Sequence, residues 1–147
     1  MTIRPITPDD RDTFKALSTE FYNSKAVSHT IPEEYHDRAF DHMMEDDRYS
    51  RCFFAEEQGT VIGYALLSLT YSREAGGMAV WIEELYIRPE YQGAGLGGRI
   101  LDLILAAYPD AKRFRLELTT GNPAEHLYTR KGFERFPYEQ MVYDRLI

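Results

Sequence analysis

Residues 85–98 read LYIRPEYQGAGLGG, and this stretch decides the fold class of the 147-residue chain. An apolar strand ends at Ile87, a glycine-rich loop follows, and apolar residues then recur at helical spacing from Leu96 until Pro109. The first amides of a helix have no partners within it, and the helix dipole favours anions there. Glycines allow several loop amides to turn toward one ligand. The stretch therefore predicts a strand–loop–helix unit whose loop binds a phosphorylated molecule.

The residues on both sides of this unit complete a single α/β domain over residues 1–147. The strand after the helix should run parallel to the strand before it, in a right-handed crossover. Short glycine-bearing turns between the earlier strands favour antiparallel hairpins. We therefore expect a mixed, mostly antiparallel sheet with a central parallel β-α-β crossover and flanking helices. Periodicity and turn residues predict helices beginning near residues 8, 32, 96 and 123, and strands at 2–6, 51–57, 61–71, 78–87, 114–119, 133–136 and 140–146.

The composition argues against several classes of protein. The formal net charge of −7 disfavours nonspecific nucleic-acid binding, because that binding needs lysine and arginine to displace counterions. One cysteine, Cys52, provides no internal disulfide and, with four scattered histidines, no zinc site of the usual spacing, so we expect no metal. The chain has no long uninterrupted apolar run and its start lacks a secretory pattern. We expect a cytoplasmic protein without a membrane partner.

Two familiar nucleotide-binding motifs fit the glycine loop poorly. Gly93, Gly95 and Gly98 match the dinucleotide fingerprint, but the segment 88–92 separates the loop from its strand, and the unit lies late in the chain. A nucleoside triphosphate loop requires Gly-Lys-Ser/Thr, whereas this chain has Gly97-Gly98-Arg99. We therefore disfavour a nicotinamide dehydrogenase, and we find no lysine to bind a γ-phosphate.

The same loop also reads Gln92-x-x-Gly95-x-Gly97 after an Ile-x-Glu-Leu-Tyr-Ile-x-Pro strand, and it resembles the GCN5-related N-acetyltransferase (GNAT) family. A second segment, AEHLYTRKGF at residues 124–133, resembles that family's later motif, and the element order matches over nearly the whole chain. The resemblance implies acetyl-CoA as co-substrate and a bulge that separates the two parallel strands. The residues that it implies for cofactor binding are Leu85, Tyr86 and Ile87 on the strand and Gln92, Gly93, Ala94, Gly95, Leu96, Gly97 and Gly98 in the loop.

The resemblance also implies direct transfer of an acetyl group from a thioester to a primary amine. An alkylamine with a pKa of about 10.4 arrives protonated, so a carboxylate must accept a proton. Glu83 is the first expected acceptor and Glu84 the second, with their side chains on opposite faces of the strand. The Ile87 amide is the expected donor to the acyl oxygen, and Tyr128 matches the family tyrosine that protonates the departing thiolate. Asn122 has two interpretations, a cofactor contact or a helix N-cap.

The expected acceptor is a small cationic amine. The segments 61–71 and 81–85 look similar to the diamine and polyamine acetyltransferase branch of the family. A polycation would also suit the acidic face predicted for one helix, formed by Glu34, Asp37, Asp41 and Glu45. The alternative function is a non-catalytic acyl-CoA-binding sensor with the same fold. A homodimer is a further expectation, with the apolar end Leu146-Ile147 as the candidate contact.

Overall fold

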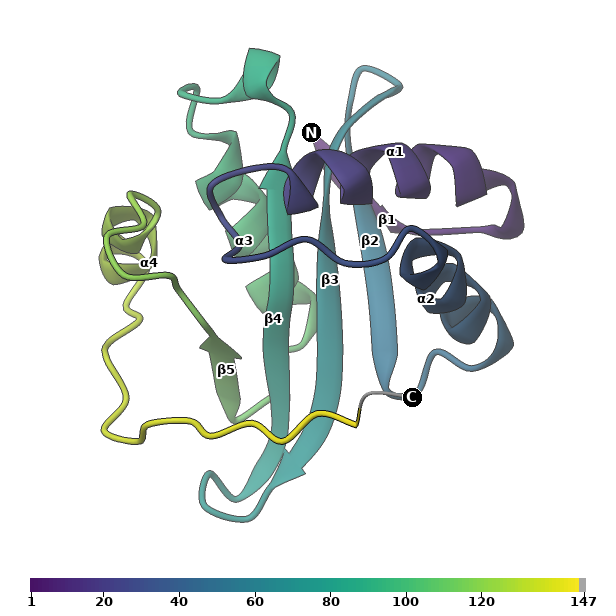
Figure 1. Cartoon of the computed structure of the whole chain (residues 1–147). Coiled ribbons are helices and arrows are strands. Elements are labelled where there is room, and N and C mark those ends of the chain that lie inside the picture. Colours follow the sequence, from purple (N-terminus) through teal and green to yellow (C-terminus); the bar gives the residue numbers. More distant parts are fainter. Residues whose placement is uncertain (146–147) are drawn as a thin grey trace.

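The computed structural model describes residues 1–145, which form one sheet with helices on both of its faces (Figure 1). The strand order is β1-β2-β3-β4-β5, and every neighbouring pair is antiparallel except β4 and β5, which are parallel. This arrangement confirms the expected mixed sheet with a central β-α-β crossover. The elements are β1 (Thr2–Pro5), α1 (Arg11–Tyr22), α2 (Glu34–Glu45), β2 (Ser50–Glu57), β3 (Thr60–Ser72), β4 (Gly77–Ile87), α3 (Leu96–Ala107), β5 (Arg113–Leu116) and α4 (Glu125–Arg130).

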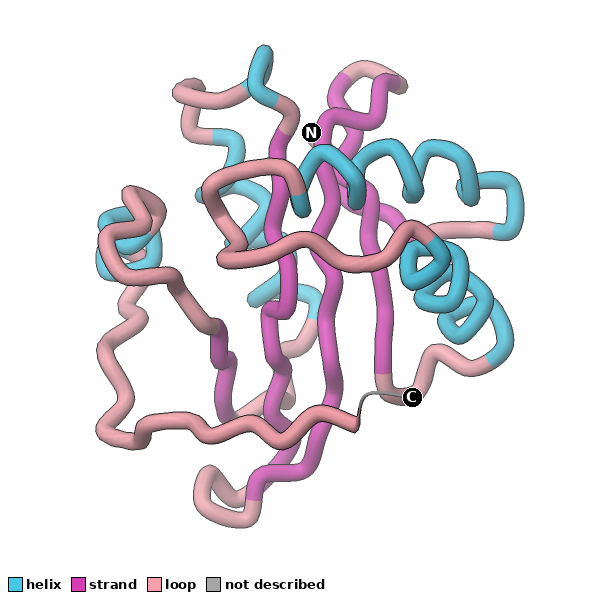
Figure 2. Tube along the Cα trace, in the orientation of Figure 1, coloured by secondary structure: helices cyan, strands magenta, loops and turns pink. Residues whose placement is uncertain are grey.

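Two hydrophobic clusters hold the helices against the sheet. On the face covered by α3, aliphatic residues such as Ile62, Leu67 and Ile104 are almost fully buried. On the face covered by α1 and α2, the cluster is rich in aromatic rings, among them Phe14 and Tyr64. Figure 2 shows α1 and α2 in front of the strands and α3 behind them. The glycine loop and the helix α3 that it opens therefore lie on the opposite side of the sheet from α1 and α2.

A capping box begins the first helical segment. Asp10 accepts a hydrogen bond from the Thr7 amide at 2.7 Å, in the short 3-10 turn Pro8–Asp10 that precedes α1. The guanidinium of Arg4 binds the same carboxylate at 2.7 Å, and this partner lowers the pKa of Asp10 to about 2. The predicted helix start at Thr7 and Pro8 is confirmed, and it ties β1 to α1.

A bulge in β4 opens the sheet where the sequence resemblance implied one. The β3–β4 register runs from Leu66 opposite Glu84 to Leu67 opposite Ile82, so that Glu83 is the extra residue. The parallel pairing of β4 with β5 ends at the next register position, Ile82 opposite Leu116. Beyond that point β5 bends away from β4 (Figure 1), and the chain continues as a loop.

The two C-terminal strands predicted at 133–136 and 140–146 do not form. Residues 133–145 contain no strand, and residue 146 lies outside the described part of the chain, as does the Leu146-Ile147 contact expected for a dimer. The segment instead crosses the end of the sheet at which β4 begins (Figure 1). The alternating apolar residues that predicted strands here must therefore make contacts other than strand pairing.

Side-chain contacts explain where these C-terminal aromatic residues lie. The Arg113 and Arg115 guanidinium groups lie 4.9 and 5.3 Å from the centroid of the Phe136 ring. Tyr138 packs edge-on against Phe136 and donates a hydrogen bond to Glu74 at 3.0 Å. Phe136 thus packs on two arginines of β5, and Tyr138 binds the carboxylate of Glu74 in the turn between β3 and β4. Neither contact requires the segment to pair with the β5 backbone as a strand.

Candidate active site

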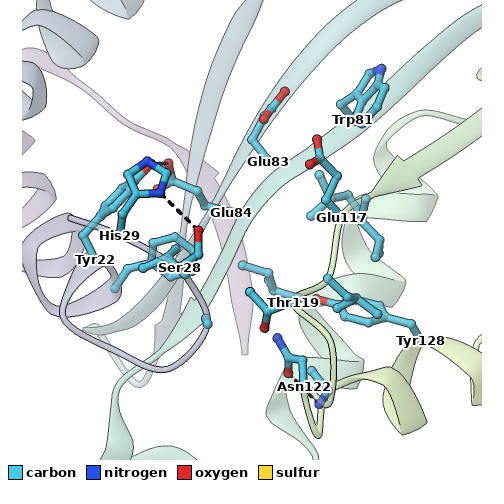
Figure 3. Close-up of a pocket in the computed structure, with 18 of the residues that line it drawn as sticks. Tyr22, Ser28, His29, Trp81, Glu83, Glu84, Glu117, Thr119, Asn122 and Tyr128 are labelled. Carbon is cyan, nitrogen blue, oxygen red and sulfur yellow. Dashed lines mark hydrogen bonds between the residues drawn. The ribbon is translucent and has the colours of Figure 1, made fainter. Parts of the chain in front are cut away.

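A cleft of about 390 Å³ occupies the gap that opens between β4 and β5 (Figure 3). The segment 81–85 of β4 forms one wall, and residues 116–119 after β5, with Asn122 and Tyr128, form the other. The connection between α1 and α2, residues 26–31, closes a third side. Segments far apart in the sequence therefore meet around the bulge.

Both candidate proton acceptors line this cleft. The strand alternation that predicted opposite faces for Glu83 and Glu84 is wrong here, because the bulge inserts Glu83 and breaks the two-residue repeat. Glu83 is exposed, and within residues 1–145 it accepts no hydrogen bond. Glu84 is half-buried. The two carboxylates thus face one cavity from different environments.

Two tyrosines hold the Glu84 carboxylate. Tyr64 on β3 donates to Oε1 at 2.5 Å, and Tyr22 at the end of α1 donates to Oε2 at 3.0 Å. Burial raises the pKa of Glu84, the two phenol donors oppose that shift, and the nearby charge of Glu83 adds to it. Burial together with the Glu84 charge raises the pKa of both tyrosines, which keeps them protonated as donors.

A third carboxylate, which the sequence analysis did not select, completes the acidic lining. Glu117 follows β5 directly, and Figure 3 shows it across the cleft from Glu83, near Trp81. Within residues 1–145 it takes part in no ion pair. No sequence pattern marks Glu117 as a cleft residue, because it reaches the cleft only where the chain after β5 diverges from β4.

The acidic face of α2 is not part of the cleft. Arg11 of α1 forms ion pairs with Asp37 at 3.1 Å and Asp41 at 2.5 Å, and Lys15 binds Asp37 at 2.9 Å. None of these residues lines the cavity. Two of the four acidic residues of that helix face, Asp37 and Asp41, are therefore engaged in ion pairs between α1 and α2, and the face lies outside the cleft.

The backbone of β4 beyond the bulge presents hydrogen-bonding groups to the gap. Arg88 donates from its amide to the Ile62 carbonyl at 2.9 Å, so these two residues form a hydrogen-bonded pair of the antiparallel ladder. Because such pairs alternate with non-hydrogen-bonded ones, the neighbouring pair of Ile87 with Gly63 is of the second kind. The amide and carbonyl of Ile87, and by the same alternation those of Leu85, point away from β3 and toward the gap.

Tyr86 differs from its two strand neighbours. Its backbone faces β3, where its ladder partner is Tyr64, and its phenol donates to Glu20 at 3.0 Å. The Ile87 carbonyl accepts a hydrogen bond from the Gln92 side chain at 2.7 Å. Gln92 therefore holds the start of the loop against the end of β4.

The glycine loop has the conformation of an anion-binding site. Gly93 and Gly95 have φ values of 83° and 76°, which L-residues with a side chain rarely adopt, and Gly95 is the residue before α3. Within the described chain, no protein group accepts a hydrogen bond from the amides of residues 93–98, and Arg99 is the first to donate, to the Gly95 carbonyl. Six consecutive amides are thus available at one helix start.

Tyr128 and Asn122 form the wall of the cleft nearest α4. Tyr128 is 9% exposed, packs edge-on against Phe133, and points its hydroxyl toward the cleft (Figure 3); burial raises its pKa to about 12. Asn122 accepts a hydrogen bond from the Ala124 amide at 2.9 Å, just before α4. The N-cap residue of α4 is Ala124, so Asn122 braces the turn before the helix and is not its N-cap, while its side chain lines the cleft.

Sequence comparison decides the family. The family model described as acetyltransferase (GNAT) family matches residues 12–133, which include the glycine loop, the cleft and α4. The chain belongs to the GNAT family. Within a GNAT domain, the bulge in β4 and the free amides before α3 are the features that the sequence resemblance implied.

Curated relatives of this GNAT chain are named as N-acetyltransferases. A thialysine N-epsilon-acetyltransferase of Sus scrofa is 33% identical over 81 residues, which are 52% of this chain and 47% of that protein. The spermine/spermidine N(1)-acetyltransferase of Bacillus subtilis (strain 168) is 32% identical over 83 residues, which are 52% of this chain and 55% of that protein. The chain thus matches about half the length of these relatives.

The fold also matches solved structures over nearly its full length. A predicted acetyltransferase from Clostridium acetobutylicum, solved with acetyl-CoA, superposes with a TM-score of 0.76 at 16% identity, covering 97% of this chain and 95% of that one. Among residues 1–145, no cluster of three or more His, Cys, Asp or Glu side chains is arranged to hold a metal. No helix in the same residues is long and apolar enough to cross a membrane.

Proposed function

We propose that this GNAT chain is an acetyl-CoA-dependent N-acetyltransferase that moves an acetyl group directly to a primary amine of a small, positively charged molecule of the polyamine class. One observation carries the proposal: the gap between β4 and β5 has carboxylates at its bulge and leads along free backbone groups to the amides of residues 93–98. The curated relatives, which are named for thialysine and spermine or spermidine, support an amine acceptor.

The available backbone groups suit the two parts of coenzyme A. Amides at a helix start bind phosphate oxygens, so those of Gly93 through Gly98 would hold the pyrophosphate. The outward-facing Leu85 carbonyl and Ile87 amide would pair with the amides of the pantetheine arm, as an added strand does, while the Ile87 carbonyl stays bonded to Gln92. Acetyl-CoA would supply the acetyl thioester at the level of the bulge. Of the three β4 residues that the sequence resemblance implied for cofactor binding, only Leu85 and Ile87 would then contribute backbone groups, because the Tyr86 backbone faces β3.

Glu84 is the proposed proton acceptor. A substrate ammonium with a pKa of about 10.4 must lose a proton before its nitrogen can attack. A carboxylate whose pKa is raised by burial is a stronger base than an exposed one, and two tyrosines fix the orientation of Glu84. Glu83 is exposed and, within residues 1–145, accepts no hydrogen bond. We therefore reverse the order expected from the sequence and assign Glu83 to attraction of the cationic substrate.

Tyr128 would donate a hydrogen bond to the departing sulfur. With a pKa of about 12, its hydroxyl is protonated at neutral pH. Complete transfer of that proton to a thiolate, whose conjugate acid has a pKa of about 8.5, is unfavourable. The favourable contribution is therefore stabilisation of developing negative charge by a buried donor. The amide that would stabilise the acyl oxygen is that of Leu85, which faces the gap beside the bulge, whereas the Ile87 amide expected from the sequence lies about 13 Å along the strand from the bulge residue Glu83.

The charge of the cleft supports a substrate with more than one positive group. Glu83 and Glu117 are exposed at its mouth, on opposite walls, and Trp81 presents an aromatic ring beside them. Two carboxylates in addition to Glu84 would attract a second ammonium group as well as the reacting one. An extended di- or polyamine meets this requirement, whereas a neutral or acidic acceptor does not.

Acceptor specificity can be measured by thiol release from acetyl-CoA with spermidine, a lysine peptide and an aminoglycoside at several ionic strengths. We expect kcat/KM to be highest for spermidine. It should fall as the salt concentration rises, because salt screens the attraction between the cleft carboxylates and the cationic substrate. Calorimetric titration with CoA provides the binding control. Coenzyme binding without thiol release with any amine would overturn the proposal and leave an acyl-CoA-binding sensor.

A further inference from the structure

The two hydrogen bonds to Glu84 come from different sides of the carboxylate. Tyr22 is the last residue of α1, is half-buried and lines the cleft, and it donates to Oε2 at 3.0 Å. Tyr64 of β3 is 0% exposed, does not line the cleft, and donates to Oε1 at 2.5 Å. Oε2 is therefore the carboxylate oxygen on the cleft side, and Oε1 is the one that the core encloses.

Packing fixes Tyr64 and leaves Tyr22 room to move. The Tyr64 ring packs against three other aromatic rings of the core, with centroids 6.1 to 6.2 Å away. The Tyr22 ring has edge contacts with Phe21 at 5.3 Å and with His36 of α2 at 5.9 Å, and it also borders the cavity. A weaker hydrogen bond to Glu84 would leave Tyr64 in place, whereas Tyr22 ends a helix and can shift.

The connection that follows Tyr22, residues 23–33, has few contacts with the rest of the molecule. Within residues 1–145 its hydrogen bonds reach only residues close in sequence, and none reaches the sheet. Its side chains are exposed except those of Ser24, Val27 and Ile31, which are half-buried. Such a segment opens at little cost in free energy. Figure 3 shows His29 of this connection on the same side of the cleft as Tyr22, whose hydrogen bond to Glu84 ties that wall to β4.

The strength of this hydrogen bond depends on the charge of Glu84. A phenol bonds an ionised carboxylate roughly twice as strongly as a neutral acceptor. When the substrate ammonium gives a proton to Glu84, one N–H bond breaks, an O–H bond forms on Oε2, and both groups become neutral. The second proton that the nitrogen loses on forming the amide neutralises the thiolate of CoA, and Glu84 then returns its proton to water. Oε2 thus alternates between a strong acceptor and a hydroxyl group.

We infer that Tyr22 is a positioning residue, whose hydrogen bond to Oε2 fastens the connection 23–33 against the cleft while Glu84 is ionised and loosens once Oε2 carries a proton. The wall is then closed around the incoming amine and loosened when the acetylated product has to leave. The inference rests on the proposed function for the source of that proton. In the free protein, acid protonates the same oxygen, so the fastening can be tested without turnover.

Other titratable groups lie around Glu84 and Tyr22. Those that line the cleft are Glu83 of β4, His29 of the connection, Glu117 after β5 and Tyr128 of α4. Cys52 of β2 and Tyr64 face Glu84 from the core, and His36 packs on Tyr22. Burial raises the pKa of Cys52 and Tyr64, which therefore stay neutral, and it lowers the pKa of His36. The titration of the two histidines must therefore be separated from that of Glu84.

Hydrogen exchange of the free protein tests the fastening. Amide protection over residues 23–31, corrected for the intrinsic effect of pH, should fall about tenfold as the pH is lowered through the pKa of Glu84, which burial raises above its ordinary value. Tyr22→Phe removes the bond, so protection should be low at every pH. Glu84→Gln, which is neutral throughout, should also lack the step. A wild-type protein without a step, or a step that persists in Glu84→Gln and so belongs to a histidine, would overturn the inference.

Two further tyrosine variants serve as comparisons. Tyr64→Phe removes the other donor to ionised Glu84 and raises its pKa, so the step should remain and move to higher pH by about one unit. Tyr35→Phe removes an exposed hydroxyl at the far end of the connection and should leave both the protection and the step unchanged. Wild-type protection in Tyr22→Phe, or the same loss in Tyr22→Phe and Tyr35→Phe, would overturn the fastening.

Kinetics separate this inference from the proposed function. With spermidine, Tyr22→Phe and Tyr64→Phe should both move the acid limb of kcat/KM to higher pH, because each loses a donor to Glu84. Only Tyr22→Phe should also raise KM, by about tenfold, because only this change loosens the cleft wall. An unchanged KM in Tyr22→Phe would overturn the positioning role. Absence of turnover with every amine, combined with the expected exchange step, would overturn the proposed function and leave the fastening intact.

Discussion

The two halves of β4 differ in what they leave unpaired. From Gly77 to Ile82 the strand is paired with β3 on one edge, and from Ala79 to Ile82 it is also paired with β5 on the other. From Glu84 to Ile87 it pairs with β3 alone. The first half places Ala79, Val80 and Ile82 in the core, whereas the second half carries the cleft carboxylates. One strand therefore provides stability before the bulge and binding groups after it.

The difference shows how little change a sheet needs to gain a site. A single extra residue, Glu83, ends the regular ladder and lets the neighbouring strand diverge. Backbone groups that would have bonded to β5 are then available to a ligand that approaches as a strand does. If the two halves are as separate in energy as they are in pairing, substitutions beyond the bulge should change activity and substitutions before it should change stability.

The largest expected effect is on activity and comes from the half beyond the bulge. Glu84→Gln removes the proposed proton acceptor while keeping the side-chain shape, and we expect kcat/KM to fall by about 10²–10⁴-fold. The matched change in the other half is Val80→Ala, at a residue that is 1% exposed. It should lower the free energy of unfolding by about 2 kcal/mol and leave kcat/KM near the wild-type value. Steady-state kinetics and urea unfolding of both variants test this, and equal losses of activity in the two would contradict the division.

The next effect concerns the contact that holds the second half against β3. A Cβ added at Gly63 would lie 2.1 Å from the Tyr86 carbonyl oxygen, which is backbone and cannot move aside. We expect Gly63→Ala to cost about 3 kcal/mol of stability and to weaken CoA binding, because β4 must shift beyond the bulge. Gly59→Ala, in the open β2–β3 turn with a φ of 80°, is the control, with about 1 kcal/mol of strain and no effect on CoA. Thermal unfolding and calorimetry measure both, and a stable Gly63→Ala protein would contradict the close approach.

Local signals were sufficient to predict the strand–loop–helix unit. The glycines, the apolar spacing from Leu96 and the order of elements are properties of neighbouring residues, and α3 begins and ends where they indicate. Gly132, which follows α4 closely, has a φ of 95°, as a helix-terminating glycine should. The candidate residues Glu84, Asn122 and Tyr128 do meet in one cleft.

The remaining features depend on contacts that no local pattern records. The donors to Glu84 come from Tyr64 and Tyr22, which are 20 and 62 residues away. The alternation rule failed at Glu83 because a bulge depends on how strands pair and not on the strand's own sequence. The C-terminal aromatic pattern was interpreted as strands, although Phe136 packs on arginines of β5. Tertiary contacts decided each of these cases.

The smallest effect compares two glycines with similar φ values, one in the turn before β4 and one in the loop before α3. Gly95 and Gly76 have φ values of 76° and 81°, and a Cβ added at either would meet nothing within 4 Å. Alanine should therefore cost similar conformational strain, about 1 kcal/mol, at both positions. At Gly95 the strain also turns amides of the proposed pyrophosphate site, so Gly95→Ala should raise the Kd for CoA by about tenfold, which corresponds to about 1.4 kcal/mol. Gly76→Ala, in the turn before β4, should leave that Kd unchanged, and calorimetric titration with CoA compares the two variants directly. Equal affinities would mean that the loop amides contribute nothing special to binding, and the anion site would then have to lie elsewhere along the gap.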